Sequence, residues 1–96
     1  MKRYVYRKIA SPNALRLRGQ GSDINSLIIS NITDSDILLS ISLEGSGVQF
    51  YITKNTRVIS GESLNPFPNG YSFDAEYTFV VKLNSGEADI VLILEN

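Results

Sequence analysis

The residues best suited to chemistry lie at the start of the chain, where basic side chains are interleaved with tyrosines. Residues 1–22 contain six bases and no acid, whereas residues 23–96 contain three bases and all ten acids, so local charges of +6 and −7 leave a net charge of −1. The basic and aromatic side chains of this segment, called the basic set below, are Lys2, Arg3, Tyr4, Tyr6, Arg7, Lys8, Arg16 and Arg18. Such side chains bind phosphates or carboxylates, so the segment is a candidate docking surface.

Two partners are chemically possible for the basic set. Bases alternating with tyrosines are typical of proteins that bind single-stranded nucleic acid. However, Lys54, Arg57 and Lys82 are scattered among the acids, and the sequence pI is about 5.2, whereas nucleic-acid-binding domains usually have a broad basic footprint. We therefore expect the partner to be an acidic protein surface and not nucleic acid.

The composition favours a protein without enzymatic activity. The chain has no His and no Cys, which removes the commonest general base and metal ligand and any disulfide. Asp34 and Asp36 could bind calcium, but the rest of a calcium loop is missing and Asp is itself a common turn residue. The candidates for the carboxylate pair of a glycosidase are Asp74, Glu76, Glu62 and Asp89. Nothing in the sequence brings any two of them together. We predict no catalytic residues, no cofactor, no metal and no membrane partner.

Aromatic and amide side chains are concentrated in the loop LNPFPNGYSFDA at residues 64–75. Two prolines exclude this segment from a central strand, and Asn69-Gly70 predicts a tight turn within it. Phe67, Tyr71 and Phe73 resemble the composition of a sugar-binding loop, so they form a possible ligand site. The competing interpretation, which we favour, is that Phe67 and Phe73 cap one end of the core.

The elements that must position these residues are strands, because apolar residues recur with period two almost throughout. No segment carries the apolar stripe of a helix. The predicted inward sets are Ile37, Leu39, Ile41 and Leu43; Val48, Phe50 and Ile52; Tyr77, Phe79, Val81 and Leu83; and Ile90, Leu92 and Leu94. Val91 and Ile93 are also apolar, which predicts that the last strand is central and covered on both sides.

Short polar turns separate these strands. TDSD at 33–36, EGSG at 44–47 and NSGE at 84–87 are hairpin-sized, and they predict an antiparallel meander. The fold class is therefore all-β, a small antiparallel β-sandwich, Ig-like or jelly-roll-like, with seven or eight strands. We divide the chain into residues 1–13, a basic N-terminal arm or first edge strand, and residues 14–96, a single β-sandwich domain. In an edge strand over residues 2–9, Val5 and Ile9 would point one way, and Tyr4, Tyr6 and Lys8 the other.

Residues 26–95 resemble a family of small β-sandwich virion proteins of tailed bacteriophages, many of them marine. The resemblance is carried by an apolar strand ending in Asn, an aromatic strand running into Lys-Asn, a Val, a Gly and a Leu, and an Asp leading into a final strand that ends in Glu. Here these residues are Asn31, Phe50, Tyr51, Lys54, Asn55, Val58, Gly61, Leu64, Asp89 and Glu95. The chain departs from the family at YSFDAEYTF, where a Gly-Asp turn is usual, and in its basic start.

The resemblance implies a virion structural protein made in the host bacterial cytoplasm. The expected role is capsid decoration or cementing on an array of identical subunits, with other virion proteins as partners and with self-association on the particle. A neck, tail or fibre location is the alternative within this class, and a carbohydrate-binding module is the alternative outside it. No role of the basic set follows from the resemblance.

Overall fold

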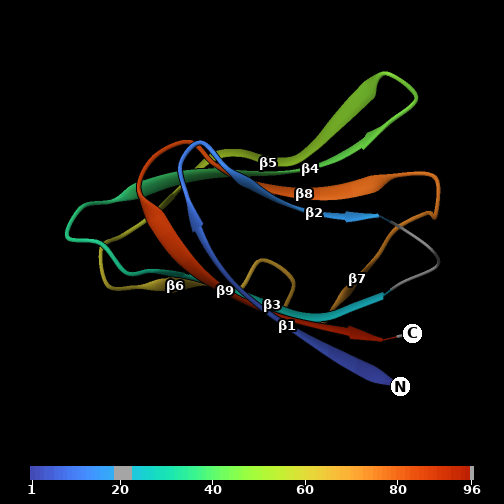
Figure 1. The fold of residues 1–96 in the computed structure, drawn as a ribbon, viewed down its shortest axis with the longest axis horizontal. Helices are drawn as coiled ribbons and strands as arrows, with labels where there is room; N and C mark the ends of the chain where they lie inside the picture. Colours follow the sequence, from blue (N-terminus) through green and yellow to red (C-terminus); the bar gives the residue numbers. More distant parts are fainter. Residues whose placement is uncertain (19–22, 96) are drawn as a thin grey trace.

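The computed structural model describes residues 1–18 and 23–95, and within them it contains nine strands and no helix (Figure 1). Residue 96, the end of the predicted domain, lies outside this part. The strands are β1 (Lys2–Ala10), β2 (Ala14–Arg18), β3 (Asp23–Asn31), β4 (Ile37–Gly45), β5 (Val48–Val58), β6 (Ser63–Leu64), β7 (Tyr71–Ser72), β8 (Thr78–Leu83) and β9 (Glu87–Glu95). With no helix in the described residues, none is available to cross a membrane.

The strands form two antiparallel sheets packed face to face, which confirms the predicted all-β sandwich (Figure 1). The first sheet has the order β1-β9-β3-β6, with β7 also pairing with β3, and the second has the order β2-β8-β4-β5. The nine strands exceed the predicted seven or eight because β6 and β7, only two residues long each, pair briefly with β3.

The connections correct the predicted meander. Among the described strands, β4 and β5 alone are consecutive in sequence and paired with each other, so EGSG closes a hairpin. TDSD and NSGE instead link β3 to β4 and β8 to β9, and both links pass from one sheet to the other. Crossing between sheets lets successive amphipathic strands cover opposite sides of one core.

The core lies between the inner faces of the two sheets. The predicted inward residues of β4, β8 and β9 that are almost fully buried are Ile37, Leu39, Ile41, Phe79, Val81, Leu83, Ile90, Leu92 and Leu94. From β3 the core receives Ile24, Leu27 and Ile29, whose spacing changes at a bulge between Ile24 and Ser26. The period-two pattern therefore identified the core of these strands correctly.

Two predicted faces are wrong. Val48, Phe50 and Ile52 of β5 are exposed, because the β4–β5 hairpin extends past the first sheet, which does not cover it there (Figure 1). β9 is central in its sheet, but Val91 on its outer face is 37% exposed. In the described chain no element packs over that face, so β9 is covered on one side.

β1 belongs to the sandwich. It pairs with β9 along its whole length, from Lys2 opposite Glu95 to Ala10 opposite Glu87. Ile9 is buried and Val5 partly buried against the core, whereas Tyr4 and Tyr6 are exposed on the other face. Removing this strand would uncover the edge of β9, so β1 cannot be treated as a detachable arm.

Candidate docking site

β1 and β2 diverge from a shared turn and leave one side of the sandwich open. The turn at residues 11–13 contains a cis Ser11-Pro12 peptide bond, and the N–H of Asn13 donates to the carbonyl of Ala10 (2.9 Å). From there β1 enters the first sheet and β2 the second (Figure 1). Both are edge strands, and between them runs a groove of about 720 Å³. We call it the β1–β2 groove.

The groove combines an apolar floor with a basic rim. Its lining consists of Arg3, Tyr4, Val5, Arg7, Lys8, Ile9, Asn13, Ala14, Leu15, Arg16 and Leu17. On β2, Leu15 is buried and Leu17 partly buried. These two leucines were not among the predicted site residues, although the alternation in ALRLR indicates an inward leucine face.

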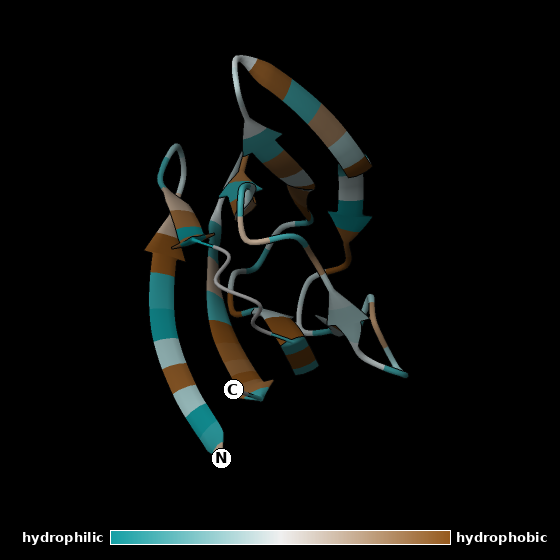
Figure 2. Cartoon of the chain, turned by 90° about the vertical axis from the view of Figure 1, so that its right-hand side faces the viewer, coloured by the Kyte–Doolittle hydropathy of each residue, from teal (hydrophilic) through white to brown (hydrophobic). Residues whose placement is uncertain are grey.

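Two arginines occupy inward positions on β1. Cross-strand pairs place Arg3 opposite Leu94 and Arg7 opposite Ile90, and both partners are core residues. Residues directly opposite each other in a sheet share a face, so Arg3 and Arg7 lie on the core-facing side of the edge strand. Figure 2 shows hydrophilic and hydrophobic bands along this strand. Inward charges on an edge strand discourage unselective pairing and favour a partner that brings acids.

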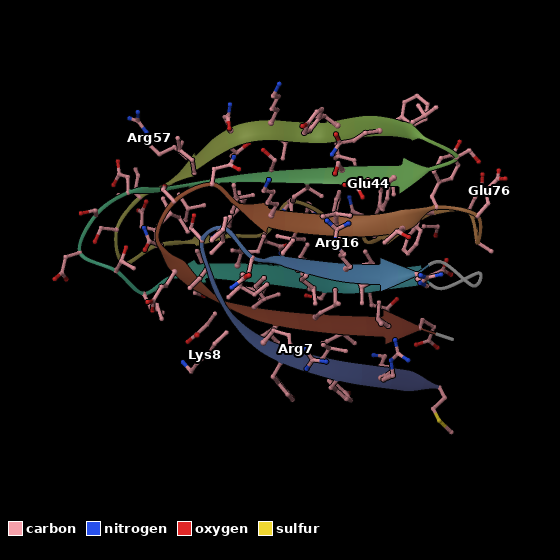
Figure 3. The ribbon with its side chains drawn as sticks, turned by 45° about the horizontal axis from the view of Figure 1, so that its top comes forward. Arg7, Lys8, Arg16, Glu44, Arg57 and Glu76 are labelled. Carbon is pink, nitrogen blue, oxygen red and sulfur yellow. The ribbon has the colours of Figure 1, made fainter. Side chains whose placement is uncertain are left out.

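Arg7 Nη1 donates a hydrogen bond to the carbonyl of Tyr6 (2.9 Å), and two other members of the basic set have carboxylate partners within the chain. The Lys8 Nζ lies 2.9 Å from Asp89 Oδ1, and the Arg16 Nη1 lies 2.7 Å from Glu44 Oε1. Arg16 reaches Glu44 across β8, and Figure 3 shows the two on the same sheet, away from Arg7 and Lys8. The basic set is therefore divided among the rim of the groove, the outer face of the first sheet and the outer face of the second sheet.

The chemistry available at the groove is recognition of an extended acidic segment. β1 and β2 each have one neighbouring strand in the described chain, so the outer backbone edges of both can pair with an added strand. Arg3 and Arg7 are exposed guanidinium groups that suit carboxylates geometrically. Val5 and Leu17 supply apolar surface between them.

The structure places the aromatic residues of the 64–75 loop mainly in the core. Phe67 and Phe73 are each 8% exposed, and both rings lie against Phe79, with centroids 6.0 and 5.7 Å away. Tyr71 stacks on Phe67 at 4.7 Å. This agrees with the capping interpretation. A shallow cleft of about 390 Å³ remains beside Tyr71 and Phe73, with Phe50 and Tyr77 on its other side.

The carboxylates considered for metal binding or hydrolysis have structural contacts. Asp36 accepts a hydrogen bond from the backbone N–H of Ser60 (3.1 Å) and lies 3.8 Å from Arg57. Asp89 pairs with Lys8. Within residues 1–18 and 23–95, no three acidic side chains gather in a metal-binding arrangement.

Comparison with known proteins identifies the fold alone. No protein-family profile matches the chain, and no curated protein matches it. The structure is similar to the crystal structure of the Drosophila NLP core, which was described for its insight into pentamer formation and histone binding. The TM-score is 0.59 over 97% of this chain and 95% of that chain, at 13% sequence identity.

Proposed function

We propose that this chain is a non-enzymatic structural protein of a tailed-bacteriophage virion that decorates or cements the capsid. The observation that carries the docking role is the β1–β2 groove, an open side of the sandwich with two inward arginines above an apolar floor. The virion setting is supported by the resemblance of residues 26–95 to phage virion β-sandwiches. The protein is then made in the host bacterial cytoplasm and ends on the particle.

Docking proceeds by addition of an acidic strand or loop to the groove. Backbone hydrogen bonds along β1 or β2 supply affinity without requiring a deep pocket. Alternate side chains of the added segment contact the charged rim and the apolar floor, which gives specificity. The acidic partner is a virion protein, with the major capsid protein as the first candidate. Residues 23–96 hold only three scattered bases among ten acids, which supports an acidic protein partner over nucleic acid, because nucleic-acid-binding domains usually have a broader basic footprint.

An array of identical subunits makes such a site effective. Exposed ion pairs are individually weak and are screened beyond about 8 Å at physiological salt. When copies also contact each other, each bound copy raises the occupancy of the rest. Self-association on the particle is consistent with the described pentamer formation of the NLP core, because the sandwich of this chain shares that fold.

Two alternatives to capsid decoration use either the same groove or the 64–75 loop. A neck, tail or fibre component would use the β1–β2 groove on a smaller ring of subunits. A carbohydrate-binding module built on Phe67, Tyr71 and Phe73 is less well supported, because Phe67 and Phe73 are needed to fill the core.

The test is the copy number of the protein in purified particles. Virions of the phage that encodes the chain are purified on a density gradient and analysed by quantitative mass spectrometry against the major capsid protein. We expect a fixed ratio of high copy number for decoration, and a few copies per particle for a neck or tail component. Absence from the particles, with the protein left in the soluble lysate and shifting single-stranded nucleic acid, would contradict the proposal.

A further inference from the structure

The outer face of the second sheet contains a polar depression of about 270 Å³ that lies outside the 64–75 loop. Its centre is formed by the small residues Ser40, Ser42 and Val80 on the two inner strands, β4 and β8. The register places Arg16, Val80, Ser42 and Tyr51 in one row across all four strands. Long side chains on the outer strands thus surround small ones, which hollows the sheet surface.

The floor of the depression presents hydroxyl groups. Ser40 and Ser42 are only 7% and 2% exposed although they point away from the core. Ser40 Oγ accepts hydrogen bonds from the backbone N–H of Asn55 (3.0 Å) and from Nδ2 of Asn84 (3.1 Å). Ser42 Oγ accepts one from Nε2 of Gln49 (3.2 Å). These bonds use acceptor positions of the two oxygens, which leaves their hydroxyl protons as donors in a floor that is nearly buried.

The rim is rich in cations and has one aromatic ring. Three cations and one carboxylate line the depression, namely Arg16, Lys54, Lys82 and Glu44. Arg16 and Glu44 neutralise each other at 2.7 Å, which leaves the two lysines to set the charge. Lys54 Nζ lies 5.0 Å from the centre of the Tyr51 ring, and Tyr51 is half-exposed.

The backbone of β5 fixes this arrangement. Asn55 has a φ of +52°, within an irregular part of the β4–β5 register. Asn84 Nδ2 donates to Asn55 Oδ1 (2.7 Å) as well as to Ser40. This network joins β4, β5 and the loop after β8 at the depression, so the hydroxyl floor is held in place before any ligand binds.

We infer that this depression binds a sugar residue carrying a carboxylate or sulfate group. A donor-rich floor and two lysines require a ligand with many acceptors and a negative charge. Lys54 Nζ lies over one face of the Tyr51 ring, so a sugar ring would contact the edge or the other face of Tyr51, and the volume of the depression suits a single residue of a longer chain. The small volume of the depression predicts an affinity of about millimolar for one copy, and an assembled array would raise the avidity. This site is independent of the β1–β2 groove as a docking site, although both are bordered by Arg16.

The test is a titration of the ¹⁵N-labelled chain followed by NMR. The probe is a hyaluronan tetrasaccharide, in which glucuronate alternates with N-acetylglucosamine; chitotetraose is the neutral counterpart, and sodium sulfate is the ion alone. We expect amide shifts at Ser40, Tyr51, Asn55 and Asn84 with the acidic probe, and weaker binding of the other two. Lys82→Gln should weaken binding about tenfold, as expected for loss of one charge-assisted hydrogen bond. Lys2→Gln, a matched change on β1, should not weaken it.

Four outcomes would overturn the inference. Equal binding of chitotetraose would show that the lysines do not select charge, and equal binding of sulfate would show that no sugar is recognised. Shifts confined to β1 and β2, or no shifts at saturating probe, would show that the depression is not the site. None of these results bears on particle docking, which is measured separately by copy number.

Discussion

At the scale of single residues, Gly61 is the clearest backbone requirement. It follows β5 with a φ of +77°, and its N–H donates to the carbonyl of Asn31 (3.2 Å). No heavy atom lies within 4 Å of an added Cβ, so a substitution is opposed by backbone strain and not by a clash. The local signal for this positive φ is a glycine within the turn composition of Ile59-Ser60-Gly61-Glu62, because few other residues adopt that conformation.

We therefore expect Gly61→Val to lower the free energy of unfolding by about 1–2 kcal/mol. Thermal melting followed by circular dichroism measures the change. Gly61→Asn is the matched control, because Asn tolerates the left-handed region better than a β-branched residue. If the Val variant melts at the wild-type temperature, the turn does not depend on glycine.

Asn31 is the most heavily bonded buried side chain at the end of β3. Its Nδ2 donates to the carbonyls of Ser35 (2.8 Å) and Val58 (2.9 Å), and its Oδ1 accepts from the N–H and the hydroxyl of Thr33. It is 2% exposed. The sequence marked Asn31 only through its place in the family pattern, because an amide that joins two turns through tertiary contacts leaves no local signal.

Asn31→Ala should destabilise the fold by about 2 kcal/mol or more, because it leaves buried backbone groups without partners. Urea unfolding measures this, with Asn25→Ala on the same strand as the control. Asn25 is exposed and its amide makes a 3.3 Å bond to Glu95, so its replacement should change stability little. Equal effects of the two changes would contradict the role assigned to Asn31.

At the scale of elements, two adjacent residues of β9 lie on opposite faces of the first sheet. Leu92 is fully buried and Val91, its neighbour, is 37% exposed. Leu92→Asp should abolish folding because it places an unpaired charge in the core. Val91→Asp should give a soluble protein with a cooperative melt. A folded Leu92→Asp variant, or loss of folding in both, would show that the faces are assigned wrongly.

The sequence predicted strand faces well where a second sheet covers them and poorly where it does not. In β4, β8 and β9 the alternation identified residues that are buried. In β5 the same alternation misplaced Phe50, which is 53% exposed, because a period of two identifies a face but cannot say whether another element packs on it. The turn signals at TDSD and NSGE were also correct as turns, but local composition does not encode which sheet receives the next strand.

At the scale of the whole molecule, the basic segment was recognised from charge alone, but its geometry was not. The sequence could not show that Arg3 and Arg7 lie on the inner face, since that depends on pairing with β9, which is distant in sequence. Nor could it show that Arg16 is paired with Glu44 across β8. Such relations arise from sheet order.

Docking should therefore depend on the inner-face arginines more than on total charge. Arg3→Glu with Arg7→Glu should abolish binding to particles stripped of this protein, and wild-type binding should weaken as salt rises. The control is Lys54→Glu with Lys82→Glu, an equal change of charge on the outer face of the second sheet. Sedimentation with the particles measures occupancy. Equal occupancy of both variants at every salt concentration would argue against a role for the groove.

Decoration of a capsid through the β1–β2 groove can be seen directly in a cryo-EM map of the virion. We expect copies of the sandwich arranged over the capsid lattice, each with an acidic segment of its neighbour lying between β1 and β2 and contacting Arg3 and Arg7. A particle without the domain, or one in which the domain is held through the β5 edge with the groove open to solvent, would contradict it.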